Sequence, residues 1–303
     1  MSMKKILIAG GSGFIGKMLS EYFLSKGFDV AILSREKRDE KNIFSWDPQK
    51  EEMDENAFRG ISCIINLSGA SISGKRWTRK RKQEIVNSRM QSTDFLYEKL
   101  RTEKHEVDTF ISASGVGYYG SHKDEWLDET SLPSYDFLST CCRYWEESAS
   151  KVSSLGIRVV IFRLGIVLSL RGGALPEFAL PVKLFAGSPL GSGKQFISWI
   201  HHADLCSLFL KAAEDKNMHE IYNAVSPEPV TNRVFVKTLA QTLKRPMFLP
   251  PVPSFVLNLI LGEMASAVTQ GQRVSCKKNI EAGFKYQFPQ MNEALKNIYA
   301  QNS

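Results

Sequence analysis

The sequence predicts an α/β fold, a Rossmann-type doubly wound parallel sheet with a smaller C-terminal substrate lobe. Two observations carry this prediction: strand and helix patterns alternate as far as residue 170, and the first strand runs directly into a glycine-rich turn. Strands that alternate with helices form parallel sheets, since each crossover returns through a helix. From residue 171 onward, glycine- and proline-rich segments interrupt the alternation.

The predicted domain boundaries follow from that change of pattern. A nucleotide-binding Rossmann domain is expected over 1–170, with returning segments at about 195–225. Residues 171–303 are expected to form mainly the substrate lobe and to include a small domain at about 250–297. At 303 residues, the chain is long enough for one large domain or two lobes.

An apolar strand over residues 4–9 leads into glycines at positions 10, 13 and 16. Glycine lets the backbone turn sharply and approach a ligand closely. Residues 17–25 then carry a helical apolar pattern, and the N–H groups at the start of such a helix suit a diphosphate. A second strand at 29–35 closes a βαβ unit, which favours a dinucleotide site over a tight turn that binds nothing.

The end of the second strand indicates which dinucleotide is bound. NAD sites place an acidic residue there for the ribose hydroxyl, whereas an arginine accommodates the 2′-phosphate of NADP. This chain has Ser34 and Arg35, and a guanidinium presents a planar set of donors to a phosphate. Glu36 is the competing acidic residue, displaced by two positions. We therefore expect NADP.

Later elements follow from the same patterns. A strand at 61–67 ends in the small residues Ser68, Gly69 and Ala70. Ligands of such sheets lie beyond the carboxyl ends of the strands, so this loop is expected near the glycine loop. Further elements are predicted, in chain order, as a helix at 78–102, strands at 109–113 and 158–163, and a short strand leading into a helix over 197–204.

Composition favours a cytoplasmic enzyme, with 43% hydrophobic and 23% charged residues. No apolar run approaches the roughly 20 residues of a membrane span, and we expect no membrane partner. The five cysteines show no CxxC spacing, so neither a disulfide framework nor a metal site is predicted. The adjacent Cys141 and Cys142 could be a reactive pair, but buried helix cysteines are the favoured interpretation.

The net charge of +7 is concentrated in the run from Lys75 to Lys82, which also contains Trp77. Such a run can mark nucleic-acid or phosphate binding. A solvated helix start is the favoured interpretation, and an anionic cofactor would also gain from a positive field nearby. Because no recognition motif accompanies the run, no nucleic-acid partner is expected.

Several motifs together carry a family resemblance: the glycine loop, the Asn66–Ala70 loop, the Ser112–Gly120 segment, Trp199–Asp204, and Tyr222–Ala224. They resemble the extended short-chain dehydrogenase/reductase superfamily. The basic stretch with Trp77, Ser88-Arg89 and Cys142–Glu146 narrows this to SDR39U1-like epimerase-family proteins. The segment from Pro250 to Leu295 resembles the small domain that ends these proteins, so the resemblance covers nearly the full chain.

The resemblance implies an NADP-binding Rossmann domain and a set of cofactor contacts. Instead of binding the cofactor, Glu84 and Arg89 could form an ion pair on the helix surface. Leu67 and Val167 could instead be core residues of strands. The implied contacts, position by position, are Gly10, Gly13, Phe14, Ile15, Gly16, Ser34, Arg35, Leu67, Ser68, Glu84, Arg89 and Val167.

The catalytic residues depart from the superfamily pattern. Its enzymes typically pair a tyrosine with a lysine four residues later on one helix, near a serine or threonine. Ser114 matches the serine, but no tyrosine of the helix at 140–146 has that lysine. Tyr118 or Tyr119 is the candidate acid, although either could simply pack against the cofactor.

Two functions therefore remain open. The first is an NADP-dependent oxidoreductase or epimerase-like enzyme for a small molecule, with sugar nucleotides and carbonyl compounds as candidate substrates. The second is an NADP-binding regulator with little turnover; some family relatives are linked to cell division. The sequence favours the first, because a whole substrate lobe is retained. Substrate and oligomeric state do not follow from the sequence.

Overall fold

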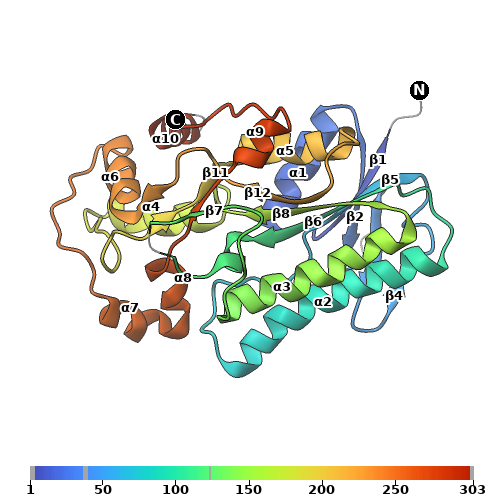
Figure 1. The fold of residues 1–303 in the computed structure, drawn as a ribbon, viewed down its shortest axis with the longest axis horizontal. Coiled ribbons are helices and arrows are strands. Elements are labelled where there is room, and N and C mark those ends of the chain that lie inside the picture. The colour runs from blue at the N-terminus through green and yellow to red at the C-terminus, as the bar shows by residue number, and fades with distance from the viewer. Residues whose placement is uncertain (1–3, 37–39, 123, 301–303) are drawn as a thin grey trace.

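The computed structural model describes residues 4–36, 40–122 and 124–300 (Figure 1). Its main sheet has eight strands in the order β12-β8-β6-β5-β1-β2-β3-β4, and only β3 and β4 pair antiparallel. This confirms the predicted α/β class. The strands are β1 (Lys5–Ala9), β2 (Asp29–Ser34), β3 (Ile43–Asp47), β4 (Glu52–Met53), β5 (Ile61–Asn66), β6 (Thr109–Gly115), β8 (Arg158–Leu164) and β12 (Glu220–Ala224).

The strand order reverses at β1. The chain moves outward through β2 and β3, then returns to the other side of β1 with β5 and continues to β6, β8 and β12. Ala9 lies in register with Leu33 on one side and Asn66 on the other. The loops that follow these three residues therefore meet at one edge of the sheet, where ligands of open α/β sheets bind.

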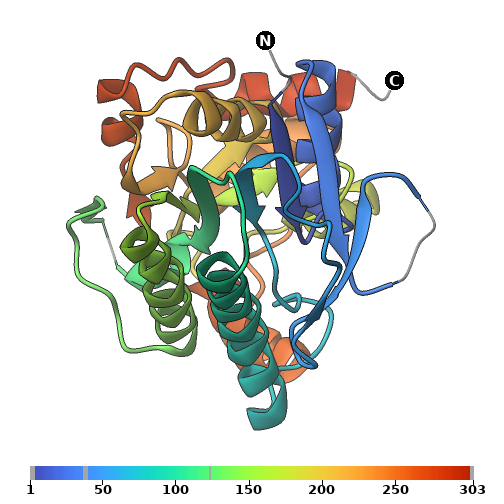
Figure 2. The ribbon, with the colours of Figure 1, turned by 90° about the vertical axis from the view of Figure 1, so that its right-hand side faces the viewer.

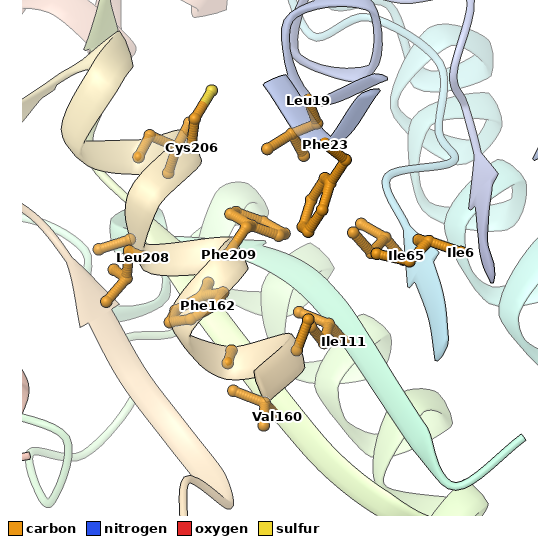
Figure 3. Close-up of a cluster of buried hydrophobic side chains, with 14 of the residues drawn as sticks. Ile6, Leu19, Phe23, Ile65, Ile111, Val160, Phe162, Cys206, Leu208 and Phe209 are labelled. Carbon is orange, nitrogen blue, oxygen red and sulfur yellow. The ribbon is translucent and has the colours of Figure 1, made fainter. Parts of the chain in front are cut away.

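Helices cover both faces of this sheet (Figures 1 and 2). One face carries α1 (Phe14–Ser25) and α5 (His202–Glu214), and the other carries α2 (Arg79–Thr102) and α3 (Phe137–Ser150). Because both faces are buried, the strands are almost continuously apolar. The core under α1 and α5 contains Ile6, Leu19, Phe23, Ile65, Ile111, Val160, Phe162, Leu208 and Phe209 (Figure 3).

The C-terminal part lies beside this sandwich, at the left of Figure 1. It has its own apolar cluster, which includes Trp199, Phe235 and Leu295. In the described part of the chain, no helix is long and apolar enough to span a membrane. Its elements and the short segments near them are β7 (Trp126–Leu127), β9 (Ile166–Leu168), α4 (Ala174–Lys183), β10 (Phe196–Ile197), β11 (Trp199–His201), β13 (Val230–Thr231), α6 (Asn232–Thr242), α7 (Ser254–Leu261), α8 (Ser266–Thr269), β14 (Arg273–Val274), α9 (Lys277–Glu281) and α10 (Met291–Ala300).

The predicted elements differ from the observed ones in several places, and β12 of the main sheet was not predicted as a strand. No strand was predicted for β3 and β4, whose short sequences are partly polar and only half-buried. Helix α1 begins at Phe14 rather than Lys17, because Gly13 is its N-cap. The predicted strand before α5 is split into β10 and β11, which pair with β13 and β9 instead of the main sheet.

Candidate dinucleotide site

The glycine loop is tightly folded between β1 and α1. Gly10 has a φ of 83°, and the Gly13 N–H donates to its carbonyl oxygen at 3.1 Å. A methyl group on Gly16 would lie 2.3 Å from that same oxygen. Larger side chains at these positions would clash with neighbouring backbone atoms. Because all of these residues are glycine, the N–H groups at the start of α1 stay open to a diphosphate.

The loop after β5 lies directly beside this turn. A methyl group on Gly10 would come within 3.0 Å of the Leu67 carbonyl. Ser68 is buried, and its Oγ has no hydrogen-bond partner among the residues that the structure describes. Buried hydroxyls normally have a partner. An orphaned hydroxyl next to a glycine cradle fits a dinucleotide.

Two hydrogen bonds join this loop to α2, and a third lies within the loop. The Asn66 side chain donates to Thr93 Oγ1 at 2.8 Å and accepts the Ser68 N–H at 3.1 Å. The Ala70 N–H donates to Ser88 Oγ at 2.9 Å. The polar residues at the end of β5 therefore hold the loop in place beside the glycines.

Ser34 and Arg35 lie at the same sheet edge, at the end of β2. Ser34 is buried, and its Oγ accepts the Glu36 N–H at 3.1 Å. Arg35 is exposed to solvent, free to approach an anion at this edge. That arrangement suits a 2′-phosphate, which needs a charged donor at the strand end.

Phe14, Ile15 and Val167 come together on the other side of the glycine turn. Phe14 packs against the segment that follows β9, where a methyl group on Gly172 would lie 2.9 Å from its ring. Val167 is buried, and Phe14 and Ile15 pack against the same apolar cluster. Sequence-distant residues thus form one wall of the candidate site.

Arg89 and Glu84, both on α2, have different contacts: Arg89 bonds to backbone carbonyls and Glu84 pairs with an arginine. Arg89 Nη1 donates to the carbonyl oxygens of Ala70 and Ile85 at 3.0 and 2.9 Å, so it supports the loop after β5. Its guanidinium also lies over the Trp145 ring. Glu84 is exposed and pairs with Arg81 at 2.8 Å, and that hydrogen bond lowers the pKa of its carboxyl. Neither contact tests the implied cofactor roles, which stay predictions.

A buried polar network lies at the end of β6. Ser114 donates to Glu146 Oε1 at 2.6 Å. Arg163 donates hydrogen bonds to both carboxylate oxygens of Glu146, from Nε to Oε1 at 2.9 Å and from Nη2 to Oε2 at 2.8 Å. All three residues are almost fully buried. Burial is the largest influence on the Arg163 pKa and lowers it, but the hydrogen bonds to Glu146 and Tyr119 and the charge of Glu146 together outweigh burial, so the Arg163 pKa is raised.

The two tyrosines of the 3₁₀ turn η1 (Val116–Tyr119) are placed differently. Tyr119 is fully buried; its hydroxyl donates to Asn223 Oδ1 at 2.7 Å and accepts from Arg163 Nη1 at 3.0 Å. Burial raises its pKa to about 12. Tyr118 is only half-buried, and the Arg163 guanidinium carbon lies 3.4 Å from its ring centroid.

Sequence reasoning assigned no role to Glu146, Arg163 or Asn223. Cys142 and Glu146 lie one helical turn apart on α3, the spacing of the expected tyrosine and lysine, and both contact Ser114. Burial raises the pKa of the Cys142 thiol to about 12. The sequence did offer one indication that Arg163 has a special role. It is a charged residue within the apolar strand β8, and a buried charge needs a partner.

The profile of the NAD dependent epimerase/dehydratase family matches residues 6–224, which include the glycine cradle, the loop after β5 and the Ser114 network. The chain belongs to this family. A second profile, the domain of unknown function DUF1731, matches residues 252–298.

Individual relatives narrow the comparison. The chain is 37% identical to the epimerase family protein YfhF of Bacillus subtilis (strain 168), over 97% of this chain and 98% of the relative. It is 32% identical to human epimerase family protein SDR39U1, over 98% and 100% of the two chains. The crystal structure of human SDR39U1 (isoform 2) with NADPH matches with a TM-score of 0.88 and 31% identity, covering 99% of this chain and 100% of the other.

A more distant match shows the fold alone. UDP-glucose 4-epimerase of Thermotoga maritima, solved with UDP-glucose, has a TM-score of 0.78 at 17% identity and covers 98% of this chain and 99% of its own. The recognised resemblance to SDR39U1-like proteins is therefore confirmed, together with the Rossmann-type fold.

Proposed function

We propose that this chain binds NADP at the glycine edge of the sheet and acts as an oxidoreductase or epimerase-like enzyme on a small molecule. Sugar nucleotides and carbonyl compounds are the candidate substrates. The observation that carries the proposal is the cradle itself, three close-packed glycines beside the orphaned Ser68 hydroxyl and the exposed Arg35. The NADPH in the human relative supports the same cofactor.

Bound NADP would supply hydride chemistry at this edge. The chain's own part concerns the proton and the orientation of the substrate. Ser114 donates a hydrogen bond to Glu146, so the lone pairs of its oxygen remain available to accept one from a substrate hydroxyl. Glu146 is fixed by two bonds from Arg163 and therefore holds Ser114 in one orientation.

Of the two candidate acids, Tyr118 is the better placed. The Tyr119 hydroxyl already donates to Asn223 and accepts from Arg163, and its ring has no solvent exposure. Tyr118 is partly exposed and lies against Arg163. We therefore assign proton transfer to Tyr118 and a positioning role to Tyr119.

Cofactor choice can be tested by calorimetric titration with NADPH and NADH. Arg35→Ala removes charge-assisted bonds to the 2′-phosphate, so NADPH affinity should fall about tenfold to a hundredfold and NADH affinity little. Lys26→Ala, an exposed cation at the far end of α1, is the matched control and should change neither affinity. Equal losses for both cofactors in Arg35→Ala would contradict the assignment.

Turnover can be followed by the absorbance of the reduced nicotinamide over sugar-nucleotide and carbonyl substrates. Tyr118→Phe should lower kcat by about a hundredfold or more with NADPH affinity unchanged, the typical contribution of one acid. Tyr144→Phe, on the partly exposed surface of α3, is the control. Tight NADPH binding with no oxidation by any substrate would instead support the regulatory alternative.

A further inference from the structure

Several large apolar side chains are exposed on α7 and in the segment before it. Phe248, Phe255 and Leu259 are 70%, 72% and 75% exposed, and Ile260 is 60% exposed. We call these four residues the α7 patch. Side chains of this size usually pack inside a protein, and a group of them on one surface marks an interaction site.

The basic run that was noted in the sequence lies against this patch. Arg76 Nη2 donates to the carbonyl oxygens of Leu259 and Ile260 at 2.7 and 3.0 Å. Lys82 pairs with Glu263, just beyond α7, at 2.6 Å. Residues about 180 positions apart in the sequence therefore form one surface, which joins apolar side chains to a row of cations.

The net charge of this surface is positive. Residues 72–82 contain six cations and no acidic residue, and residues 244–262 contain Lys244 and Arg245 and no acidic residue. The acidic neighbours Glu84 and Glu263 are paired with Arg81 and Lys82. Lys75, Arg79 and Lys80 remain exposed beside the patch.

We propose that the α7 patch docks the protein on an anionic lipid surface. Apolar side chains inserted at the headgroup boundary, with lysines and arginines beside them, are the pattern of interfacial helices. Figure 1 places α7 at the lower-left edge of the molecule, where a flat surface can reach it. The expectation of no membrane partner came from the lengths of apolar runs, which do not reveal a surface assembled by folding.

A second copy of the chain fits this surface less well. Two-fold pairing through the α7 patch would bring the basic runs of both copies together, and like charges across an interface oppose binding. An anionic bilayer offers the opposite sign over a wide area. The charge of the surface therefore selects the lipid over a homodimer.

The proposal is tested by co-sedimentation of the full chain with vesicles of phosphatidylcholine alone and of phosphatidylcholine with phosphatidylglycerol. We expect binding to the anionic vesicles, weakened by salt. Phe255→Ser combined with Leu259→Ser should lower the partition coefficient by about tenfold or more, because the inserted apolar area is lost. Lys75→Gln and Lys80→Gln should each lower it about fivefold.

Matched controls lie on the α1 and α9 side of the molecule. Leu24→Ser with Ile280→Ser, and Lys216→Gln with Lys277→Gln, change exposed residues of the same kinds far from α7 and should leave partition unchanged. NADPH binding and melting temperature report that each variant is folded. Equal binding to neutral vesicles, no binding to anionic ones, or an unaffected Phe255/Leu259 variant would overturn the proposal. So would sedimentation velocity that shows a dimer lost in that variant.

Discussion

One buried ion pair holds together the polar residues at the end of β6. Glu146 and Arg163 take two charges out of water and compensate each other with two hydrogen bonds. Such a pair contributes little net stability, but losing one partner leaves an uncompensated buried charge. The pair thus fixes the position of Ser114 rather than the stability of the fold.

Arg163→Met should lower the free energy of unfolding by about 3–5 kcal/mol, because Glu146 would remain charged and buried. The double variant Arg163→Met with Glu146→Gln should lose less than the sum of the single losses. Urea denaturation of the four proteins measures this coupling. Strict additivity would show that the two charges do not depend on each other.

Gly16→Ala should weaken NADPH binding at least tenfold, because the added methyl group would lie 2.3 Å from the Gly10 carbonyl and displace the turn. Gly27→Ala is the control: it has a positive φ but open space around it, so it should cost about 1 kcal/mol of stability and leave NADPH affinity unchanged. Calorimetric titration separates the two effects. Unchanged affinity in Gly16→Ala would place the diphosphate elsewhere.

At the scale of whole elements, helices α2 and α5 are each capped at the N-terminus by a side chain. Thr78 is the N-cap of helix α2, and its side chain accepts the Arg81 N–H. Helix α5 begins after His201, a fully buried residue whose Nδ1 accepts the Ala203 N–H at 3.1 Å. A histidine in this role must be neutral at that nitrogen, so the start of α5 is sensitive to pH.

Burial lowers the pKa of His201 from its usual 6.5 to about 3. Since the unfolded chain binds this proton first, the stability from His201 is complete above pH 6.5 and is lost as the pH falls from 6.5 toward 3. The loss is about 1.4 kcal/mol per pH unit. His201→Asn keeps a cap acceptor and should flatten this slope in urea titrations between neutral and acidic pH; an unchanged slope would assign it to other groups.

The whole molecule is joined through β12 and the C-terminal part. Asn279 of α9 donates to the Asn223 carbonyl at 2.7 Å, and Lys278 donates to the Ile221 carbonyl at 2.8 Å. Val274 and Cys276 pack in one apolar cluster with Tyr119. The segment matched by the second family profile therefore contributes to the apolar cluster that contains Tyr119.

We expect the chain to unfold in one cooperative transition, because these contacts join both parts. Urea curves by tryptophan fluorescence and far-UV circular dichroism should coincide. Separate midpoints would mean that the C-terminal part is an independent unit. Asn279→Ala should lower the common midpoint, because the hydrogen bonds from its side chain to the Asn223 carbonyl and to the Tyr286 hydroxyl would be lost, at a cost of about 1–3 kcal/mol.

Local pattern was sufficient to predict much of the fold and to propose the glycine cradle of the candidate site. The glycine turn, Ser34 with Arg35, and the loop after β5 are each read within a few neighbouring residues, because strand, turn and helix start lie together in sequence. The α/β class followed from their alternation. Strands β3 and β4 were not predicted, because they are short and half-buried and therefore lack an apolar pattern.

The sequence by itself determined the sheet, its glycine edge and the family, since these depend on local periodicity and motif spacing. Only the tertiary structure decided which charges meet. Glu146 and Arg163 come from a helix and a strand, Asn223 from another strand, and the basic run meets α7 from about 180 residues away. Contacts between distant segments depend on how the elements pack, and no local pattern encodes their partners.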